Sequence, residues 1–183
     1  MGQDWKRTNT YSKTVRSCLY RGAAALAMLD DARMRGIDAY DDASYELRDE
    51  AESALITGDV SLVSICAERP DETPGPDICA LCGRKFPPLT RDHLWAKSRG
   101  GKGGENFIWV CRPCNSDKGK LDLFEWINCP AGASKPVPIG ACRRYLLNAW
   151  TLCEQCGILD RQIKNVRELP FKLRSIPHEL PLR

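Results

Sequence analysis

Closely spaced cysteine pairs are the residues in this sequence with the plainest chemical potential. The chain has ten cysteines among 183 residues, and six of them form Cys-x-x-Cys pairs: Cys79/Cys82, Cys111/Cys114 and Cys153/Cys156. Two such pairs joined by a short segment supply four thiolates for tetrahedral zinc. The alternative is a set of disulfides, as in small secreted proteins. Basic residues precede the apolar run 23–29, but no small-residue cleavage site follows it, so zinc at the first two pairs is the prediction.

The remaining cysteines of the C-terminal part allow a second four-thiolate site. Cys153 and Cys156 lie near the expected end of a helix, and Cys129 and Cys142 precede them. Together these four residues could bind a second zinc ion that clamps the last helix to the finger. The alternative is that they are small buried residues, as free cysteines often are.

Between the first two pairs lies a series of polar residues. Asp92 and His93 are adjacent, the glycine-rich basic segment 99–104 follows, and Asn106 and Asn115 come next. Adjacent residues on a strand face opposite ways, so a kink or a strand end must bring the carboxylate and the imidazole to one site. Taken singly, each has another explanation: a core histidine, a carboxylate in a turn or cap, a turn-forming asparagine and a helix cap.

The complete string CALCGRKFPPLTRDHLWAKSRGGKGGENFIWVCRPCNSDKGK, from Cys79 to Lys120, resembles the HNH endonuclease family. The resemblance covers about residues 76–126 and implies a ββα-metal finger with a four-cysteine zinc clip. It also implies that Asp92 binds a catalytic divalent metal, that His93 is the general base, that Asn106 braces the loop between the strands, and that Asn115 is a second metal ligand. Asn115 stands where the family name has His, and an oxygen-rich site favours Mg²⁺ or Mn²⁺ over Zn²⁺.

The resemblance predicts an enzyme, a metal-dependent DNA endonuclease that hydrolyses phosphodiester bonds. Hydrolysis needs an activated water, which a histidine supplies well because its charge changes near neutral pH. A metal held by Asp92 and Asn115 would stabilise the transition state and the leaving oxygen. The alternative is a zinc-ribbon module that binds DNA without cutting it. The presence of Asp92, His93 and Asn115 together argues against that alternative.

The distribution of charge favours a nucleic-acid partner. The net charge is only +3, but residues 30–52 hold nine acids against three bases, whereas residues 84–120 hold nine bases against three acids. A basic segment beside a hydrolytic site favours contacts with the DNA backbone, although a solvated basic face is the alternative. The expected contacts are Lys97, Arg99, Lys102, Lys118 and Lys120. Trp95 and Trp109 are expected to belong to the core that flanks the strands.

Hydrophobic periodicity and turn residues predict an α+β fold. Helices are expected over 12–35 and 42–56, with a third short helix capped by Asp59 and a last helix over 141–156. Strands are expected over 89–94 and 107–110, with a helix that begins at Arg112 and an irregular tail after Asp160.

The turn-rich segment 70–76 is the clearest boundary along the chain. It divides a helical region, 1–70, from the HNH domain, 71–128, and the C-terminal helix and basic tail follow at 129–183. The N-terminal helices could bind a protein partner or a second copy of the chain. Mean hydropathy is −0.40, and no run approaches the roughly 20 apolar residues of a membrane span. We therefore expect a soluble, cytoplasmic protein without a membrane partner.

Overall fold

The computed structural model describes residues 14–67, 69, 75–101, 106–166 and 169–182. Three helices begin the described chain: α1 (Val15–Arg35), α2 (Asp42–Thr57) and α3 (Leu62–Ile65). The first two match the expected helices to within a few residues. The third is capped by Ser61, whose side chain accepts a hydrogen bond from the Ser64 N–H, so the cap expected at Asp59 is wrong. Each of these helices begins where a polar side chain takes up a free backbone donor.

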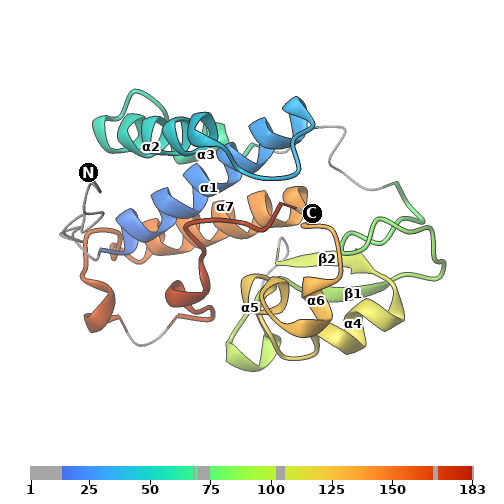
Figure 1. Cartoon of the computed structure of the whole chain (residues 1–183). Coiled ribbons are helices and arrows are strands. Elements are labelled where there is room, and N and C mark those ends of the chain that lie inside the picture. The colour runs from blue at the N-terminus through green and yellow to red at the C-terminus, as the bar shows by residue number, and fades with distance from the viewer. Residues whose placement is uncertain (1–13, 68, 70–74, 102–105, 167–168, 183) are drawn as a thin grey trace.

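A compact finger follows, with the elements that the resemblance implies. Strand β1 (Thr90–His93) pairs antiparallel with β2 (Phe107–Val110), and α4 (Arg112–Lys118) comes directly after β2. Between the strands lies the 3₁₀ helix η2 (Lys97–Arg99). The expectation of an α+β fold with a ββα finger is therefore confirmed, and Figure 1 shows the finger to one side of the helices.

Two short helices come next, in a part of the chain for which no helix was predicted. They are α5 (Leu123–Ile127) and α6 (Pro130–Ala133). The Asp122 carboxylate accepts from the Glu125 N–H, and the Glu125 carboxylate accepts from the Asp122 N–H. This reciprocal pair is a capping box, which the Asp-x-x-Glu spacing could have indicated.

Helix α7 (Ile139–Gln155) joins the N-terminal helices to the finger. It packs along α1, which also contacts α2 and α3 (Figure 1). Its Tyr145 ring lies 4.6 Å from the ring of Phe124 in α5 and 5.9 Å from that of Trp95, just after β1. The buried apolar side chains of all these elements form one core. The division into three parts stays a prediction.

Past α7 the described residues form only short helical elements, η3 (Ile163–Asn165) and η4 (Leu173–Ser175). Phe171 packs its ring 4.8 Å from that of Trp95, so this C-terminal segment covers the loop that follows β1. No helix in the described part of the chain is both long enough and apolar enough to cross a membrane.

Candidate active site

The four cysteines expected to bind zinc form a single buried cluster. Cys79 and Cys82 lie in a tight turn before β1, Cys111 caps α4, and Cys114 stands in the first turn of that helix. All four Sγ atoms lie within 4.8 Å of one another, and those of Cys82 and Cys111 are 4.0 Å apart. Tetrahedral zinc with bonds of about 2.3 Å requires sulfur atoms about 3.8 Å apart. The cluster is therefore compatible with a metal such as zinc.

The surroundings of Cys82 favour its thiolate, the form that binds metal, whereas burial raises the pKa of Cys79 and of Cys114. Burial raises the pKa of Cys82, but hydrogen bonds from Arg84, Cys79 and Cys114 outweigh this effect and lower it to about 7. The turn that carries Cys79 is closed by two hydrogen bonds, from the Cys79 N–H to the Arg84 carbonyl and from the Gly83 N–H to the Cys79 carbonyl. The turn thus holds the first pair of ligands in place.

The second zinc site predicted in the C-terminal part is wrong. Among the described residues, the cluster above is the only group of three or more side chains suited to a metal. Cys142 and Cys153 lie eleven residues apart in α7, which separates them by about 16 Å along the helix axis. They cannot bind the same ion together with Cys129 and Cys156. Cys142 and Cys153 are buried in the core instead.

Strand pairing places Asp92 and His93 on opposite faces of the hairpin. Asp92 lies opposite Ile108, and His93 lies opposite Phe107. The Asp92 side chain is turned inward and is 6 % exposed, whereas His93 is half-buried at the end of the strand. One Asp92 oxygen, Oδ1, accepts a hydrogen bond of 2.8 Å from the His93 N–H, so the carboxylate lies against the backbone of the histidine. The two expected site residues thus face opposite ways, with the Asp92 carboxylate held against the backbone of His93.

Lys118 forms a buried ion pair with Asp92. Its Nζ lies 3.1 Å from Oδ2 of Asp92 and donates a hydrogen bond of 2.6 Å to the His93 carbonyl. Burial raises the pKa of Asp92, and the ammonium of Lys118 opposes that shift. Burial likewise lowers the pKa of Lys118, and the carboxylate of Asp92 opposes that shift. Because the lysine is 1 % exposed, the DNA contact expected of Lys118 is wrong.

Asn115 and Asn106 hold the two ends of β1. The Asn115 amide donates to the Thr90 hydroxyl, 2.9 Å away, and so ties α4 to the start of the strand. The Asn106 amide group is buried beyond the other end. It accepts from the Trp95 N–H at 3.0 Å and donates to the carbonyls of Trp95 and Gly101. The loop that follows His93 is therefore fixed by Asn106.

Gly101 allows the backbone of this loop to pack directly against Trp95 and Asn106. A Cβ atom at this position would lie 2.5 Å from the Trp95 carbonyl oxygen and 2.8 Å from the Asn106 amide nitrogen. Both distances are too short for a side chain, so the site requires glycine. The loop around Asn106 is packed as tightly as a protein core.

The donor atoms of Asp92 and Asn115 are of the chemical kind that a divalent cation would take. Oδ2 of Asp92 is buried and accepts no well-aligned hydrogen bond among the described residues, although the ammonium of Lys118 lies 3.1 Å away. Asn115 uses its amide nitrogen for its hydrogen bonds to β1, which leaves its carbonyl oxygen as a potential ligand. A carboxylate oxygen and an amide oxygen are hard ligands of the kind that Mg²⁺ and Mn²⁺ prefer. The ammonium of Lys118 meanwhile neutralises the carboxylate.

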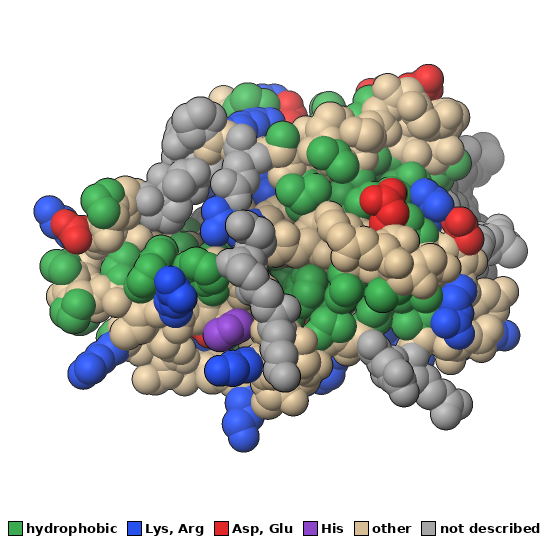
Figure 2. Space-filling view, turned by 180° about the vertical axis from the view of Figure 1, so that it is seen from behind, with side chains coloured by type: hydrophobic (Ala, Val, Ile, Leu, Met, Phe, Trp, Pro, Cys, Tyr) green, Lys and Arg blue, Asp and Glu red, His purple; other side chains and the backbone are tan. Residues whose placement is uncertain are grey.

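The other basic residues expected to contact DNA differ in their surroundings. Lys97 and Lys120 are exposed, whereas Arg99 forms an ion pair of 2.9 Å with Glu125. Lys102 lies outside the described residues. Figure 2, which views the molecule from behind, shows Lys and Arg side chains projecting from the lower left, where the finger lies. Of the expected contacts, Lys97 and Lys120 thus lie on the surface of the finger.

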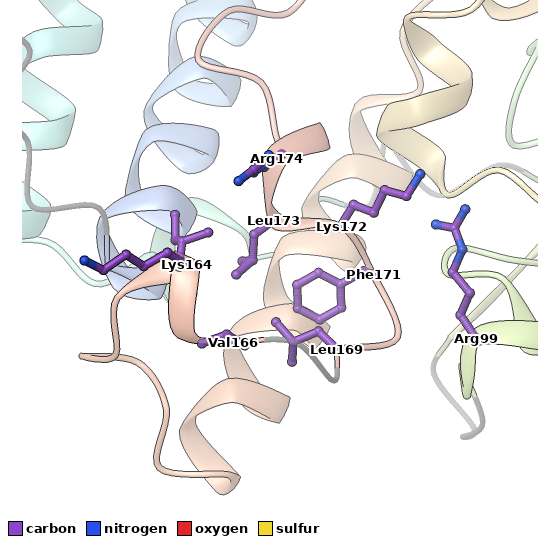
Figure 3. A pocket seen from close by; sticks show the side chains of 9 residues that line it. Arg99, Lys164, Val166, Leu169, Phe171, Lys172, Leu173 and Arg174 are labelled. Carbon is purple, nitrogen blue, oxygen red and sulfur yellow. The ribbon is translucent and has the colours of Figure 1, made fainter.

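Arg99 also connects the finger with the C-terminal segment. The carboxylate of Glu125 accepts hydrogen bonds from both Arg99 and Lys172. The charged ends of these two side chains lie side by side in Figure 3. Burial raises the pKa of Glu125, but the hydrogen bonds from Lys172, the Asp122 N–H and Arg99 outweigh this effect. Together they lower the pKa of Glu125 to about 2. A cavity of about 440 Å³ opens beside Arg99, between it and residues 163–166 and 169–174. The C-terminal segment therefore helps to position the loop that carries Arg99.

Trp95 and Trp109 differ in a way that the sequence did not indicate. Trp95 is 5 % exposed, as expected of a core residue, but Trp109 is 48 % exposed, so its assignment to the core is wrong. The guanidinium of Arg91 lies over the rings of both Phe107 and Trp109, at 4.5 and 5.3 Å from their centres. The outer face of the hairpin is therefore aromatic and positively charged.

Among the comparisons with known proteins, the match lies within the finger. No curated protein and no solved structure matches the chain. Residues 79–121 do match a family model, and they include the four clustered cysteines, both strands and the helix that carries Asn115 and Lys118. The family is described as HNH endonuclease, and the resemblance of this segment to the HNH family is thereby confirmed.

Proposed function

We propose that the protein is a metal-dependent DNA endonuclease whose active centre is formed by Asp92, His93, Asn106 and Asn115. The HNH segment and its cysteine cluster point to a nuclease-type function. The observation that carries the proposal is the buried Asp92 carboxylate, whose Oδ1 accepts from the His93 N–H and whose Oδ2 lies 3.1 Å from the buried ammonium of Lys118. Burying an ion pair is costly, and buried ionisable groups with shifted pKa values are frequent at functional sites.

In this proposal His93 is the general base. In the described part of the chain its imidazole has no hydrogen-bond partner, so a ring nitrogen is available to a water molecule. Its backbone is held on both sides, because the N–H donates to Asp92 and the carbonyl accepts from Lys118. The fixed backbone orients the imidazole, which takes a proton from the water that attacks the phosphorus atom.

Asp92 and Asn115 would hold one Mg²⁺ or Mn²⁺ ion. When bound, the ion supplies positive charge to the phosphoryl oxygens and to the leaving 3′-oxygen. Asn106 acts as a positioning residue, since its three hydrogen bonds fix the loop that begins one residue after His93. The exposed lysines Lys97 and Lys120 would contact backbone phosphates. Lys102 and Arg99 stay predicted DNA contacts.

The test is cleavage of supercoiled plasmid by the full-length protein in a series of divalent metals. The wild type should cut with Mg²⁺ or Mn²⁺ and stop when EDTA removes the added ion. His93→Ala should cut about 10²–10⁴-fold more slowly while it keeps its zinc content, its folding and its DNA affinity. If His93→Ala cuts as fast as the wild type, the catalytic assignment is wrong, and the zinc-ribbon module that binds DNA without cutting becomes the better explanation.

A further inference from the structure

The outer face of the hairpin is an unusual surface for a small protein. Strand alternation and the pairing register place Arg91, His93, Phe107 and Trp109 on the same face, with Arg91 opposite Trp109 and His93 opposite Phe107. Single exposed apolar residues are common on protein surfaces and need no explanation. Here two aromatic rings meet edge to face, 6.1 Å apart, on the face that carries the proposed general base.

Arg91 gives this face a positive charge. Its guanidinium lies over both rings, and none of the described acidic side chains pairs with it. Nearly half of the Trp109 side chain stays exposed beside it. An arginine and a tryptophan together attract a partner that has a flat π surface and a negative charge. An unpaired nucleobase with its phosphate has both properties, and stacking on aromatic rings is the usual way in which proteins bind unpaired bases.

We propose that Arg91, Phe107 and Trp109 form a stacking site for an unpaired base of the strand on which His93 acts. This inference rests on the proposed function and specifies its substrate as single-stranded or locally unpaired DNA. Trp109 lies one strand repeat from the His93–Phe107 pair, about 7 Å along the hairpin. This distance equals about two nucleotides at the 3.4 Å spacing of a stacked strand. A base on Trp109 would therefore hold a nearby phosphate beside His93.

The experiment measures binding rather than cleavage. A fluorescein-labelled oligothymidine of about 12 nucleotides, within the site sizes known for single-strand binding, is titrated with full-length protein without added divalent metal. A duplex of the same length is titrated in parallel. The wild type should bind the single strand more tightly than the duplex. Trp109→Ala should weaken binding to the single strand about tenfold or more, and Trp109→Phe should recover most of that loss.

Tyr45→Ala is the matched control. Tyr45 is also an exposed aromatic residue with an arginine over its ring, since the Arg48 guanidinium lies 5.2 Å from the ring centre. It lies in α2, outside the finger and among acidic residues. Its removal should leave DNA affinity unchanged. An oligonucleotide that carries abasic sites should bind the wild type as weakly as oligothymidine binds Trp109→Ala, because neither complex has a base stacked on Trp109.

Three results would overturn the stacking site. The first is an unchanged affinity of Trp109→Ala for oligothymidine. The second is a loss of affinity in Trp109→Ala that is equal for the single strand and the duplex. The third is a wild type that dimerises through Trp109 in the absence of DNA. Zinc content and thermal unfolding of each variant show that it is folded. His93→Ala should bind oligothymidine like the wild type. If His93→Ala still cuts DNA but the Trp109 effect on binding is present, the catalytic assignment fails and the stacking site stands.

Discussion

The Nζ atom of Lys118 lies 3.1 Å from Oδ2 of Asp92, and both side chains are almost completely buried. The pair connects the last residue of α4 with β1. A buried carboxylate needs a compensating positive charge. Lys118 supplies that charge in the absence of a metal ion, and a divalent cation could supply it in addition during catalysis.

Lys118→Met should destabilise the protein, because it leaves the buried Asp92 charge without a partner. The expected loss is about 3–5 kcal/mol in the free energy of unfolding, measured by urea denaturation. Addition of Mn²⁺ should recover part of this loss in Lys118→Met and have a smaller effect on the wild type. The double variant Lys118→Met/Asp92→Asn should lose less than the sum of the single changes. An additive double variant would show that the two residues do not interact.

Asp92→Ala and Asn115→Ala should both lose plasmid cleavage, through weakened metal binding rather than through loss of the base. Their activity should therefore rise when the Mn²⁺ concentration is increased, since a weaker site fills at a higher concentration. His93→Ala provides the control, because added metal cannot replace a proton acceptor. The rate is measured as a function of metal concentration for all three variants. Recovery of His93→Ala by Mn²⁺, or none for Asp92→Ala, would contradict these roles.

The zinc clip can be tested apart from catalysis. We expect about one zinc per chain by elemental analysis, bound at Cys79, Cys82, Cys111 and Cys114. Cys82→Ser should give insoluble or unfolded protein, because the binding energy of structural zinc is also folding energy. Cys156→Ser is the matched control, since Cys156 is exposed and lies outside the cluster. Soluble, folded wild-type protein without zinc would refute the assignment.

Much of the finger could be predicted from the sequence, because its signals are local. The spacing of the cysteine pairs indicated the zinc cluster, and the apolar run 107–110 coincides with β2. The same run is apolar throughout, however, so periodicity could not show that Ile108 and Val110 face inward and Trp109 outward. Which residues of β2 face inward is set by the pairing of β2 with β1, and this pairing is a tertiary contact.

The burial of Lys118 depends on tertiary packing as well. Charged residues at the end of a short helix are usually solvated, and nothing local distinguishes Lys118 from the exposed Lys120. Its position three residues after Asn115 does place both side chains on one helix face. This relation could have suggested that Lys118 approaches β1 together with Asn115. The sequence contained the clue, but only the packing of α4 on β1 shows that Asp92 is the partner.

Asn106→Ala should impair both the fold and the reaction. It removes the acceptor of the Trp95 N–H and the donor to two carbonyls in a buried loop, which should cost about 1–3 kcal/mol in the free energy of unfolding. The loop follows His93 directly, so kcat for plasmid cleavage should fall more than KM rises. Asn128→Ala is the control, because that amide donates one hydrogen bond in α5 away from the strands. An unchanged kcat in a destabilised Asn106→Ala would limit the residue to a structural role.

Glu125→Gln should change how stability depends on pH. The pKa of Glu125 is lowered to about 2 from an ordinary 4.5, so its ion pairs with Arg99 and Lys172 stabilise the fold above pH 4.5 and are lost as the pH falls towards 2. The wild type should therefore be more stable than Glu125→Gln at pH 7, by about 1–2 kcal/mol, and the difference should shrink below pH 4.5. Because protonation of the thiolates releases zinc and loss of zinc unfolds the finger, the two proteins are compared only at pH values at which both keep their zinc. Urea unfolding of both proteins from pH 7 down to the lowest such pH measures the difference, and a difference that does not shrink below pH 4.5 would show that the charge of Glu125 does not hold the C-terminal segment on the finger.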